Sequence, residues 1–280
     1  MRQVKIVTDS TVDLPKHIIE ELQIEIVPLT LTIEGRTYTD RVNITPWEFM
    51  DMMKQASELP KSSQPSVGSF LEVYNRLGEQ GYDIISIHLT GGMSGTVRSA
   101  ESAAMMTDAN VTVVDSRFIS LAMGFQVVEA AKMALDNKSV EEIIARLNQI
   151  RSSSHLYVSV DTLENLVKGG RIGRGKALLG SLLNIKPIAS LADGVYTPVA
   201  KVRSTSQVVK FLTKQFQEDI VGKRVKAVGI AHADALELAN RLKESIMQET
   251  DVEEIHICFT TPIIATHTGP GALGLMYYAE

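Results

Sequence analysis

Apolar, strand-like runs alternate with helical patterns through the first half of the chain, and this alternation limits the folds open to it. Strand patterns at Val4–Val7, Ile84–Leu89 and Val111–Val114 are separated by helical ones such as Leu14–Leu22 and Gly95–Met106. Strands that alternate with helices build a parallel sheet covered by helices on both faces. The first half therefore predicts a three-layer α/β/α domain with a mainly parallel sheet.

The second half has a different order of elements. Asp193-Gly194 lies between two apolar runs and is a strong hairpin signal. Helices and strands then alternate from a helix at Thr205–Phe216 to a strand at Glu254–Phe259. We expect a two-layer α/β domain with a mixed sheet and helices on one face. We place the boundary near Arg151–Ser154, which gives domains over residues 1–154 and 155–280 with a ligand cleft between them.

Local patterns predict individual elements. Capping boxes at Thr45–Glu48 and Ser139–Glu142 each mark the start of a helix. The apolar run Ile24–Ile33 is interpreted as a single strand. The segment His256–Ala279 lacks Asp, Glu, Lys and Arg, and it is long enough to cross a bilayer at ~20 residues. Its histidines, prolines and glycines argue against a membrane span, so we interpret it as a strand, a polar loop and a short final element.

Composition and charge exclude several classes of protein. The 280 residues are 44% hydrophobic, which supports packed cores and excludes a wholly disordered chain. With a net charge of -5, the protein lacks the positive electrostatic field of a general nucleic-acid binder, so no nucleic-acid partner is expected. Cys258 is the single cysteine, which rules out an intramolecular disulfide and suits a reducing compartment. Because the start has no signal-peptide pattern, we expect a cytoplasmic protein.

Two near-matches to nucleotide motifs fail at decisive positions. Gly170–Ala177 resembles a phosphate loop, but Ala177 stands where the magnesium-binding hydroxyl belongs. Gly269–Gly274 matches GxGxxG, yet only six residues follow it, too few for a dinucleotide fold. Around Ser94, a nucleophile elbow needs glycine where Thr96 stands. We therefore expect no nucleotide or other cofactor.

The six histidines are scattered along the chain and predict no metal site. His232 and Asp234 supply two ligands at most, which does not make a site. With the exception of His267, we interpret the histidines as ordinary surface or loop residues.

Four polar loops each follow or interrupt an apolar element and contribute the candidate residues Ser62, Ser94, Arg171 and His267. In an open α/β sheet, loops at the carboxyl ends of strands line the ligand crevice. Hydroxyls, a histidine and an arginine suit one carboxylate or phosphate held by directed hydrogen bonds. Helix capping explains Ser62 as well as anion binding does. For Arg171, a position in a solvated basic loop is an equally good interpretation.

Together these residues resemble the DegV family of bacterial fatty-acid-binding proteins. The resemblance extends over nearly the whole chain and is highly specific as a set, although each motif is weak alone. The motifs occur in family order at Thr8–Pro15, Ser62–Ser66, Ser94–Thr96, Asp161–Leu163, Gly169–Ile172 and His267–Gly271.

The resemblance implies two α/β domains that bury a long-chain fatty acid such as palmitate. It implies that Ser62, Ser94 and His267 bind the carboxylate, and that Arg171 orients that network. It also implies a separate kinase subunit that receives the presented carboxylate and makes acyl phosphate for phospholipid synthesis. The chain itself would then have no catalytic residue. Arg174, in a basic loop, and Thr268, beside His267, are the remaining candidates for orientation or partner docking.

The sequence departs from the family at two places. The family often has threonine where Ser62 stands, which keeps the hydroxyl, and Thr90–Met93 differs from the family's usual serine and leucine. Two other functions remain open. One is an acyl hydrolase or transferase that uses Ser94 and His267, and the other is a regulatory module that senses lipid.

Overall fold

A four-stranded parallel sheet forms the centre of the first half. The computed structural model describes residues 2–178 and 185–280. The sheet has the order β2-β1-β6-β7, and each neighbouring pair is parallel. Its strands are β1 (Val4–Asp9), β2 (Glu25–Val27), β6 (Asp83–His88) and β7 (Val111–Asp115).

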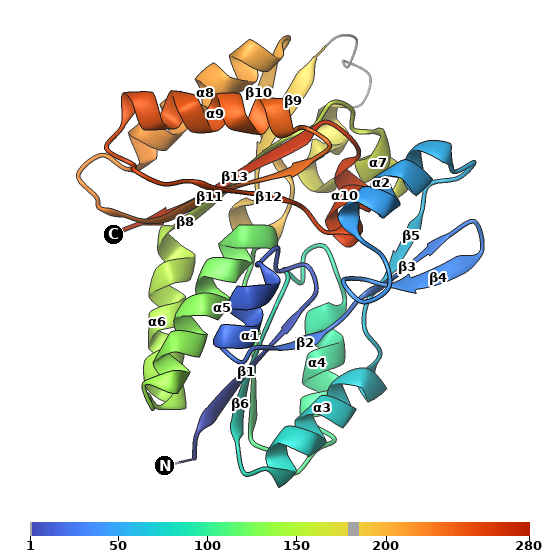
Figure 1. The fold of residues 1–280 in the computed structure, drawn as a ribbon, viewed down its shortest axis with the longest axis vertical. Coiled ribbons are helices and arrows are strands. Elements are labelled where there is room, and N and C mark those ends of the chain that lie inside the picture. The colour runs from blue at the N-terminus through green and yellow to red at the C-terminus, as the bar shows by residue number, and fades with distance from the viewer. Residues whose placement is uncertain (1, 179–184) are drawn as a thin grey trace.

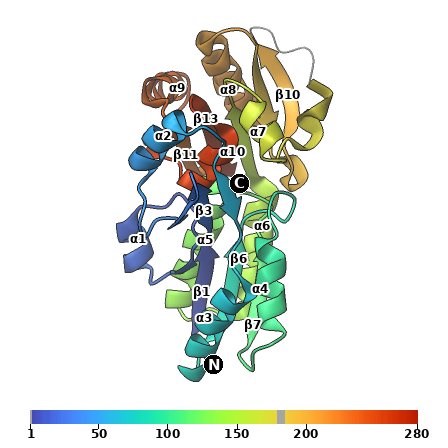
Figure 2. The ribbon, with the colours of Figure 1, turned by 90° about the vertical axis from the view of Figure 1, so that its right-hand side faces the viewer.

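Helices cover both faces of this sheet. On one face lie α3 (Val67–Glu79) and α4 (Thr96–Ala104), and on the other lies α5 (Ser120–Leu135), with α6 (Val140–Ser153) packed against it (Figures 1 and 2). The short helix α1 (Lys16–Glu21) lies on the α5 side. The predicted three-layer arrangement with a mainly parallel sheet is confirmed.

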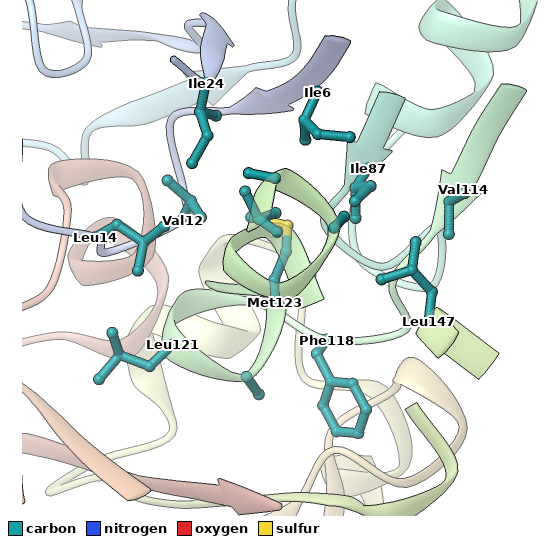
Figure 3. Packing of buried hydrophobic residues seen from close by; sticks show 14 of the residues in the cluster. Ile6, Val12, Leu14, Ile24, Ile87, Val114, Phe118, Leu121, Met123 and Leu147 are labelled. Carbon is teal, nitrogen blue, oxygen red and sulfur yellow. The ribbon is translucent and has the colours of Figure 1, made fainter. Parts of the chain in front are cut away.

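The helix α5 lies in the main apolar cluster of this half. Figure 3 shows Met123 and Leu121 of α5 among side chains from the strands and loops around them, including Ile6, Ile87 and Val114. α5 also contacts strands of the second half. A single helix therefore contributes to packing on both sheets.

The second half contains a six-stranded mixed sheet of order β10-β9-β8-β13-β11-β12. β11 and β12 are parallel, whereas the other neighbouring pairs are antiparallel. Helices α8 (Thr205–Asp219) and α9 (Leu236–Glu249) cover one face, and α5 contacts the sheet as well. The strands are β8 (Ser154–Ser159), β9 (Lys186–Ser190), β10 (Thr197–Val202), β11 (Val225–Ala233), β12 (His256–Phe259) and β13 (Ala272–Ala279). The predicted mixed sheet is confirmed, and the domain boundary stays a prediction.

A third, small sheet corrects one sequence interpretation. Ile24–Ile33 is not a single strand, because β2 ends at Val27 and a separate strand β3 (Thr30–Ile33) follows. Between them Pro28 has no N–H to donate to a ladder, and the N–H of Leu29 donates to Ser10 Oγ at 3.1 Å. β3 pairs antiparallel with both of its neighbours, outside the parallel sheet. Those neighbours are β4 (Arg36–Thr39) and β5 (Lys61–Ser63), and α2 (Pro46–Gln55) connects them along the chain.

The end of the chain also differs from the prediction. The expected polar loop is largely a helix, α10 (Pro262–Thr268), which begins with proline at its first position and ends at Gly269 with φ of 74°. The expected short element is β13, which is buried along all eight residues. It lies inside the sheet between β8 and β11, so its side chains are buried on both faces. Among residues 2–178 and 185–280, no helix has the length and apolar character needed to cross a bilayer.

Candidate functional site

A cavity of about 340 Å³ is lined by residues from both halves of the chain. That volume lies at the lower end of the range for small-molecule sites. The wall is mostly apolar, with polar side chains in two groups. The apolar side chains are Leu29, Leu89, Met93, Ile119, Leu156, Val158, Leu166, Leu191, Tyr196, Ala231, Ala233, Ile263, Ile264, Ala272 and Met276. The polar ones are Thr11, Ser62, Ser63, Gln64, Ser94, Ser120, Arg171, His232, Thr260, His267 and Thr268.

Helix α10 presents one face to the cavity along its whole length. The residues that line the cavity are Thr260, just before the helix, followed by Ile263, Ile264, His267 and Thr268. This spacing of three and four residues is that of one helical face. The cavity therefore runs beside α10, with His267 in the last turn of the helix and Thr260 just before its start.

Ser62 and His267 are in direct contact. Ser62 Oγ on β5 lies 2.7 Å from His267 Nε2 on the last turn of α10. The backbone of β5 pairs with β3, so Ser62 is held in a strand and does not cap a helix. The hydroxyl that caps α3 is that of Ser66, which accepts a hydrogen bond from the N–H of Ser69. The helix-capping interpretation of Ser62 is therefore wrong.

The imidazole of His267 is neutral at physiological pH. Burial, together with the smaller effect of the nearby positive charge of Arg171, lowers its pKa to about 4. Its other ring nitrogen, Nδ1, is buried and has no hydrogen-bond partner among the described residues. Gly169 lies so close to the ring that an added Cβ would stand 2.2 Å from Nδ1. The ring is thus confined between Ser62 on one side and the backbone of Gly169 on the other.

Arg171 connects the histidine to the Ser94 loop. It follows the short helix α7 (Glu164–Lys168), and its Nε donates to the carbonyl of Met93 at 3.0 Å. Its Nη1 donates to the carbonyl of Gly169 at 2.6 Å. The side chain is part-buried and lines the cavity, which overturns the interpretation of Arg171 as a solvated loop residue.

Ser94 lies on the same cavity wall but bonds within its own loop. Its Oγ is 2.9 Å from Thr96 Oγ1 and accepts the N–H of Thr96 at 3.3 Å. Gln64 covers the start of α4, since a Cβ on Gly95 would lie 2.1 Å from Gln64 Oε1. Both Ser63 and Gln64 were missed as candidates, although they belong to the Ser62–Ser66 motif.

The two remaining candidates differ in position. Thr268 lines the cavity, and its hydroxyl donates to the carbonyl of Ile264 at 3.1 Å. Arg174 lies outside the cavity lining, on the exposed surface, where it forms an ion pair with Asp193 at 3.7 Å. The structure therefore brings Ser62, Ser94, Arg171, His267 and Thr268 to one cavity and leaves Arg174 on the surface.

The interpretation of the histidines needs correction at two positions. His88 is fully buried between Asp9 and Ser86, and His232 is buried and lines the cavity. A histidine within an apolar strand pattern was the signal for burial. Among the described residues, no group of three or more His, Cys, Asp or Glu side chains is arranged to hold a metal ion.

Nucleophilic catalysis needs a serine, a base and a group that orients the base. The hydroxyl of Ser94 bonds to Thr96, and the serine in contact with His267 is Ser62. Nδ1 of His267 faces no carboxylate within the parts of the chain that the structure describes. The arrangement is better suited to holding a polar group than to activating a hydroxyl.

Comparisons with known proteins settle the family. The DegV family model, described as an uncharacterised protein family, matches residues 3–280. The chain belongs to the DegV family. A DegV domain-containing protein from Listeria innocua is 44% identical over 281 residues and is covered in full, as is this chain. The predicted family is confirmed.

Solved structures, among them two described as DegV proteins, share the fold over nearly their whole length. A DegV family protein from Thermus thermophilus, described by its fatty acid binding, has a TM-score of 0.94 at 34% identity, with 99% of this chain and 100% of that one covered. DegV from Bacillus subtilis, described as a fatty acid binding protein, has a TM-score of 0.92 at 33% identity, and both chains are fully covered. A stearic acid-binding protein from Eubacterium ventriosum has a TM-score of 0.88 at 27% identity, with 100% of this chain and 98% of that one covered.

Proposed function

We propose that this DegV chain binds one long-chain fatty acid in the cavity beside α10. The observation that carries the proposal is the lining of the cavity, which is mostly apolar and brings Ser62, Ser94, Arg171 and His267 to one site. A fatty acid has the same division into one polar head and a long apolar tail. The description of relatives from Thermus thermophilus and Bacillus subtilis as fatty acid binding supports the assignment.

The hydroxyl of Ser94 and the Ser62–His267 pair would hold the carboxylate. A neutral imidazole and two hydroxyls offer hydrogen bonds without a full ion pair, and Arg171 adds positive charge beside them. Burying a 16-carbon tail at ~0.8 kcal/mol per CH₂ contributes roughly 12 kcal/mol before association costs. The tail would therefore set the affinity, and the polar residues would set the position of the carboxylate.

Native mass spectrometry of the purified protein, followed by denaturation and lipid identification, tests this assignment. We expect one C16 or C18 fatty acid per chain, and we expect delipidated protein to take up palmitate one to one in calorimetry. Protein that carries no lipid and also binds none would contradict the proposal.

We further propose that the chain presents the bound carboxylate to a separate kinase subunit and has no catalytic residue of its own. Phosphoryl transfer needs a nucleotide and magnesium, and the near-match at Gly170–Ala177 lacks the magnesium-binding hydroxyl. Lys168, Arg171, Arg174 and Lys176 lie within nine residues of one another in a protein of net charge -5, and Arg171 among them lines the cavity. Such a basic segment suits an acidic partner or an incoming phosphate. Hydrolysis of an acyl ester by the chain alone, lost in Ser94→Ala, would instead establish an acyl hydrolase.

A further inference from the structure

The cavity has a second polar group, away from the carboxylate end. Thr11, Ser120, His232 and Thr260 all line the cavity, and each is at most 4% exposed. Polar side chains in such a wall need hydrogen-bond partners, because a buried polar group costs free energy unless it is hydrogen-bonded.

Hydrogen bonds show that these four residues are neighbours. Thr260 N–H donates to the carbonyl of His232 at 2.9 Å, and Ser120 N–H donates to the carbonyl of Thr11 at 3.0 Å. The hydroxyls of Ser120 and Thr260 both donate to Oδ2 of Asp13, at 2.5 Å and 2.7 Å. The group therefore joins the first half of the chain to the second at one place on the cavity wall.

The four residues of this second polar group keep some capacity for hydrogen bonds to a ligand. Ser120 and Thr260 use their hydroxyl protons on Asp13, and Thr11 uses its own on Asp9 at 2.6 Å, so each oxygen is left with acceptor capacity. His232 Nδ1 accepts the N–H of Ala235 at 3.3 Å, which places the ring proton on Nε2. Among the described residues Nε2–H has no hydrogen-bond partner. The group thus offers acceptors and one free donor.

The position of the group along a bound chain follows from α10. Six positions separate Thr261, the N-cap of α10 next to Thr260, from His267, which is about 9 Å at ~1.5 Å per residue. An extended chain advances about 1.2 Å per bond. A fatty acid with its carboxylate at His267 would therefore pass Thr260 roughly eight bonds along its tail.

We propose that the cavity accommodates fatty acids with a hydroxyl group near the middle of the chain, at about carbons 8 to 10. This inference rests on the proposed fatty acid binding. A hydroxyl both donates and accepts, so it can donate to a Thr or Ser oxygen of the group while accepting Nε2–H of His232. A methylene at the same place leaves that N–H unpaired, and a hydroxyl elsewhere on the tail meets apolar walls.

The test compares positional isomers of equal size and polarity on delipidated protein. Isothermal calorimetry gives the dissociation constants of 9-hydroxyoctadecanoic acid and 14-hydroxyoctadecanoic acid. Their ratio shows how much a hydrogen bond at mid-chain adds to the affinity. We expect the 9-hydroxy isomer to bind at least tenfold more tightly. Dissociation constants within threefold of each other, or a preference for the 14-hydroxy isomer, would overturn the inference.

Two variants locate the preference in the structure. His232→Phe removes the donor and keeps an aromatic ring beside Phe259, whereas Thr260→Val removes a hydroxyl at nearly constant volume. We expect each variant to reduce the ratio between the two isomers about tenfold, whatever happens to the absolute affinities. Thr268→Val removes a hydroxyl at the carboxylate end and should keep the parent's ratio.

A ratio that is the same in the parent and both variants would overturn the inference. Failure of the parent to bind either isomer or octadecanoic acid would contradict fatty acid binding itself, so the two failures are distinguishable.

Discussion

Ser62 Oγ and His267 Nε2 lie 2.7 Å apart although 205 positions separate the two residues in the chain. One is on β5 of the small antiparallel sheet, and the other is in the last turn of α10, which lies between β12 and β13 of the mixed sheet in the chain. The contact therefore forms only when both halves have folded and met. Because the imidazole is neutral and buried, the pair is poised to accept or donate hydrogen bonds to a ligand without first breaking an ion pair.

The residues proposed to bind the carboxylate should matter more for reaction than for affinity. A hydrogen bond to a charged group contributes about 1.5–3 kcal/mol, several times less than the tail. We expect Ser62→Ala, Ser94→Ala and His267→Ala to weaken palmitate binding modestly. Acyl-phosphate formation with a cognate kinase should fall much further, because the attacking oxygen is no longer held in position.

Calorimetry and a coupled kinase assay on the same preparations measure the two effects. Ser66→Ala is the matched control, since its hydroxyl caps α3 outside the cavity. Parallel losses of affinity and phosphorylation, or no loss in either, would show that these side chains do not orient the carboxylate.

The lowered pKa of His267 makes the stability of lipid-free protein depend on pH. The folded-state pKa of about 4 lies below the ordinary value of 6.5, so the unfolded chain binds the proton more readily. The free energy of unfolding should fall as pH drops from 6.5 towards 4, by up to roughly 3 kcal/mol from this residue. Urea unfolding of the parent and His267→Gln isolates that contribution.

A bound carboxylate favours the protonated imidazole and raises the pKa of His267, so palmitate should make this part of the pH dependence shallower. If the parent and His267→Gln show the same pH profile without lipid, the imidazole does not lose its proton on folding.

Gly169 should be required for the position of the histidine ring. A Cβ there would stand 2.2 Å from His267 Nδ1 and 2.9 Å from the carbonyl of Asn165, so either the ring or the backbone must move. We expect Gly169→Ala to weaken palmitate binding about as much as His267→Ala does. Gly68→Ala is the control, because its nearest neighbour would be 3.7 Å away. Equal palmitate affinities in Gly169→Ala and the parent would contradict the packing of Gly169 against the ring.

Leu156 and Leu191 should limit the length of the bound tail. Both line the cavity beside α10 and also a second, more polar cavity of about 470 Å³, so they form a partition between the two. We expect Leu191→Ala or Leu156→Ala to raise the affinity for C20 and C22 acids relative to palmitate. Each truncation should also cost about 2–5 kcal/mol of stability.

A chain-length series in a displacement assay measures this preference. Leu29 lines the cavity beside α10 and not the second one, so Leu29→Ala enlarges the first cavity without opening the partition. The same shift towards longer acids in Leu29→Ala would show that added volume, and not the partition, is responsible.

Arg174 should act in transfer and not in lipid binding. Its side chain is on the surface with Asp193 and outside the cavity lining. We expect Arg174→Glu to slow acyl-phosphate formation with a cognate kinase and to leave the palmitate affinity at the parent's value. Equal rates for the variant and the parent would remove this residue from the docking surface.

The sequence was sufficient for features that depend on nearby residues. The capping boxes at Thr45–Glu48 and Ser139–Glu142 start α2 and α6, and the Asp193-Gly194 turn joins β9 to β10. That turn needs positive φ at both positions, 56° and 72°, which this residue pair adopts readily. Capping and turn patterns depend on residues close together in the chain, so they can be interpreted without knowledge of the rest of the fold.

By itself, the sequence determined the alternating elements, the two kinds of sheet and the polar loops that carry Ser62, Ser94, Arg171 and His267. It did not show that Ile24–Ile33 divides between two sheets, because a strand pattern does not indicate which other strand it pairs with. Nor did it show that Ser62 touches His267 while Arg174 stays on the surface. Those outcomes depend on how the sheets and helices pack, and contacts between residues far apart in the chain leave no local pattern to read.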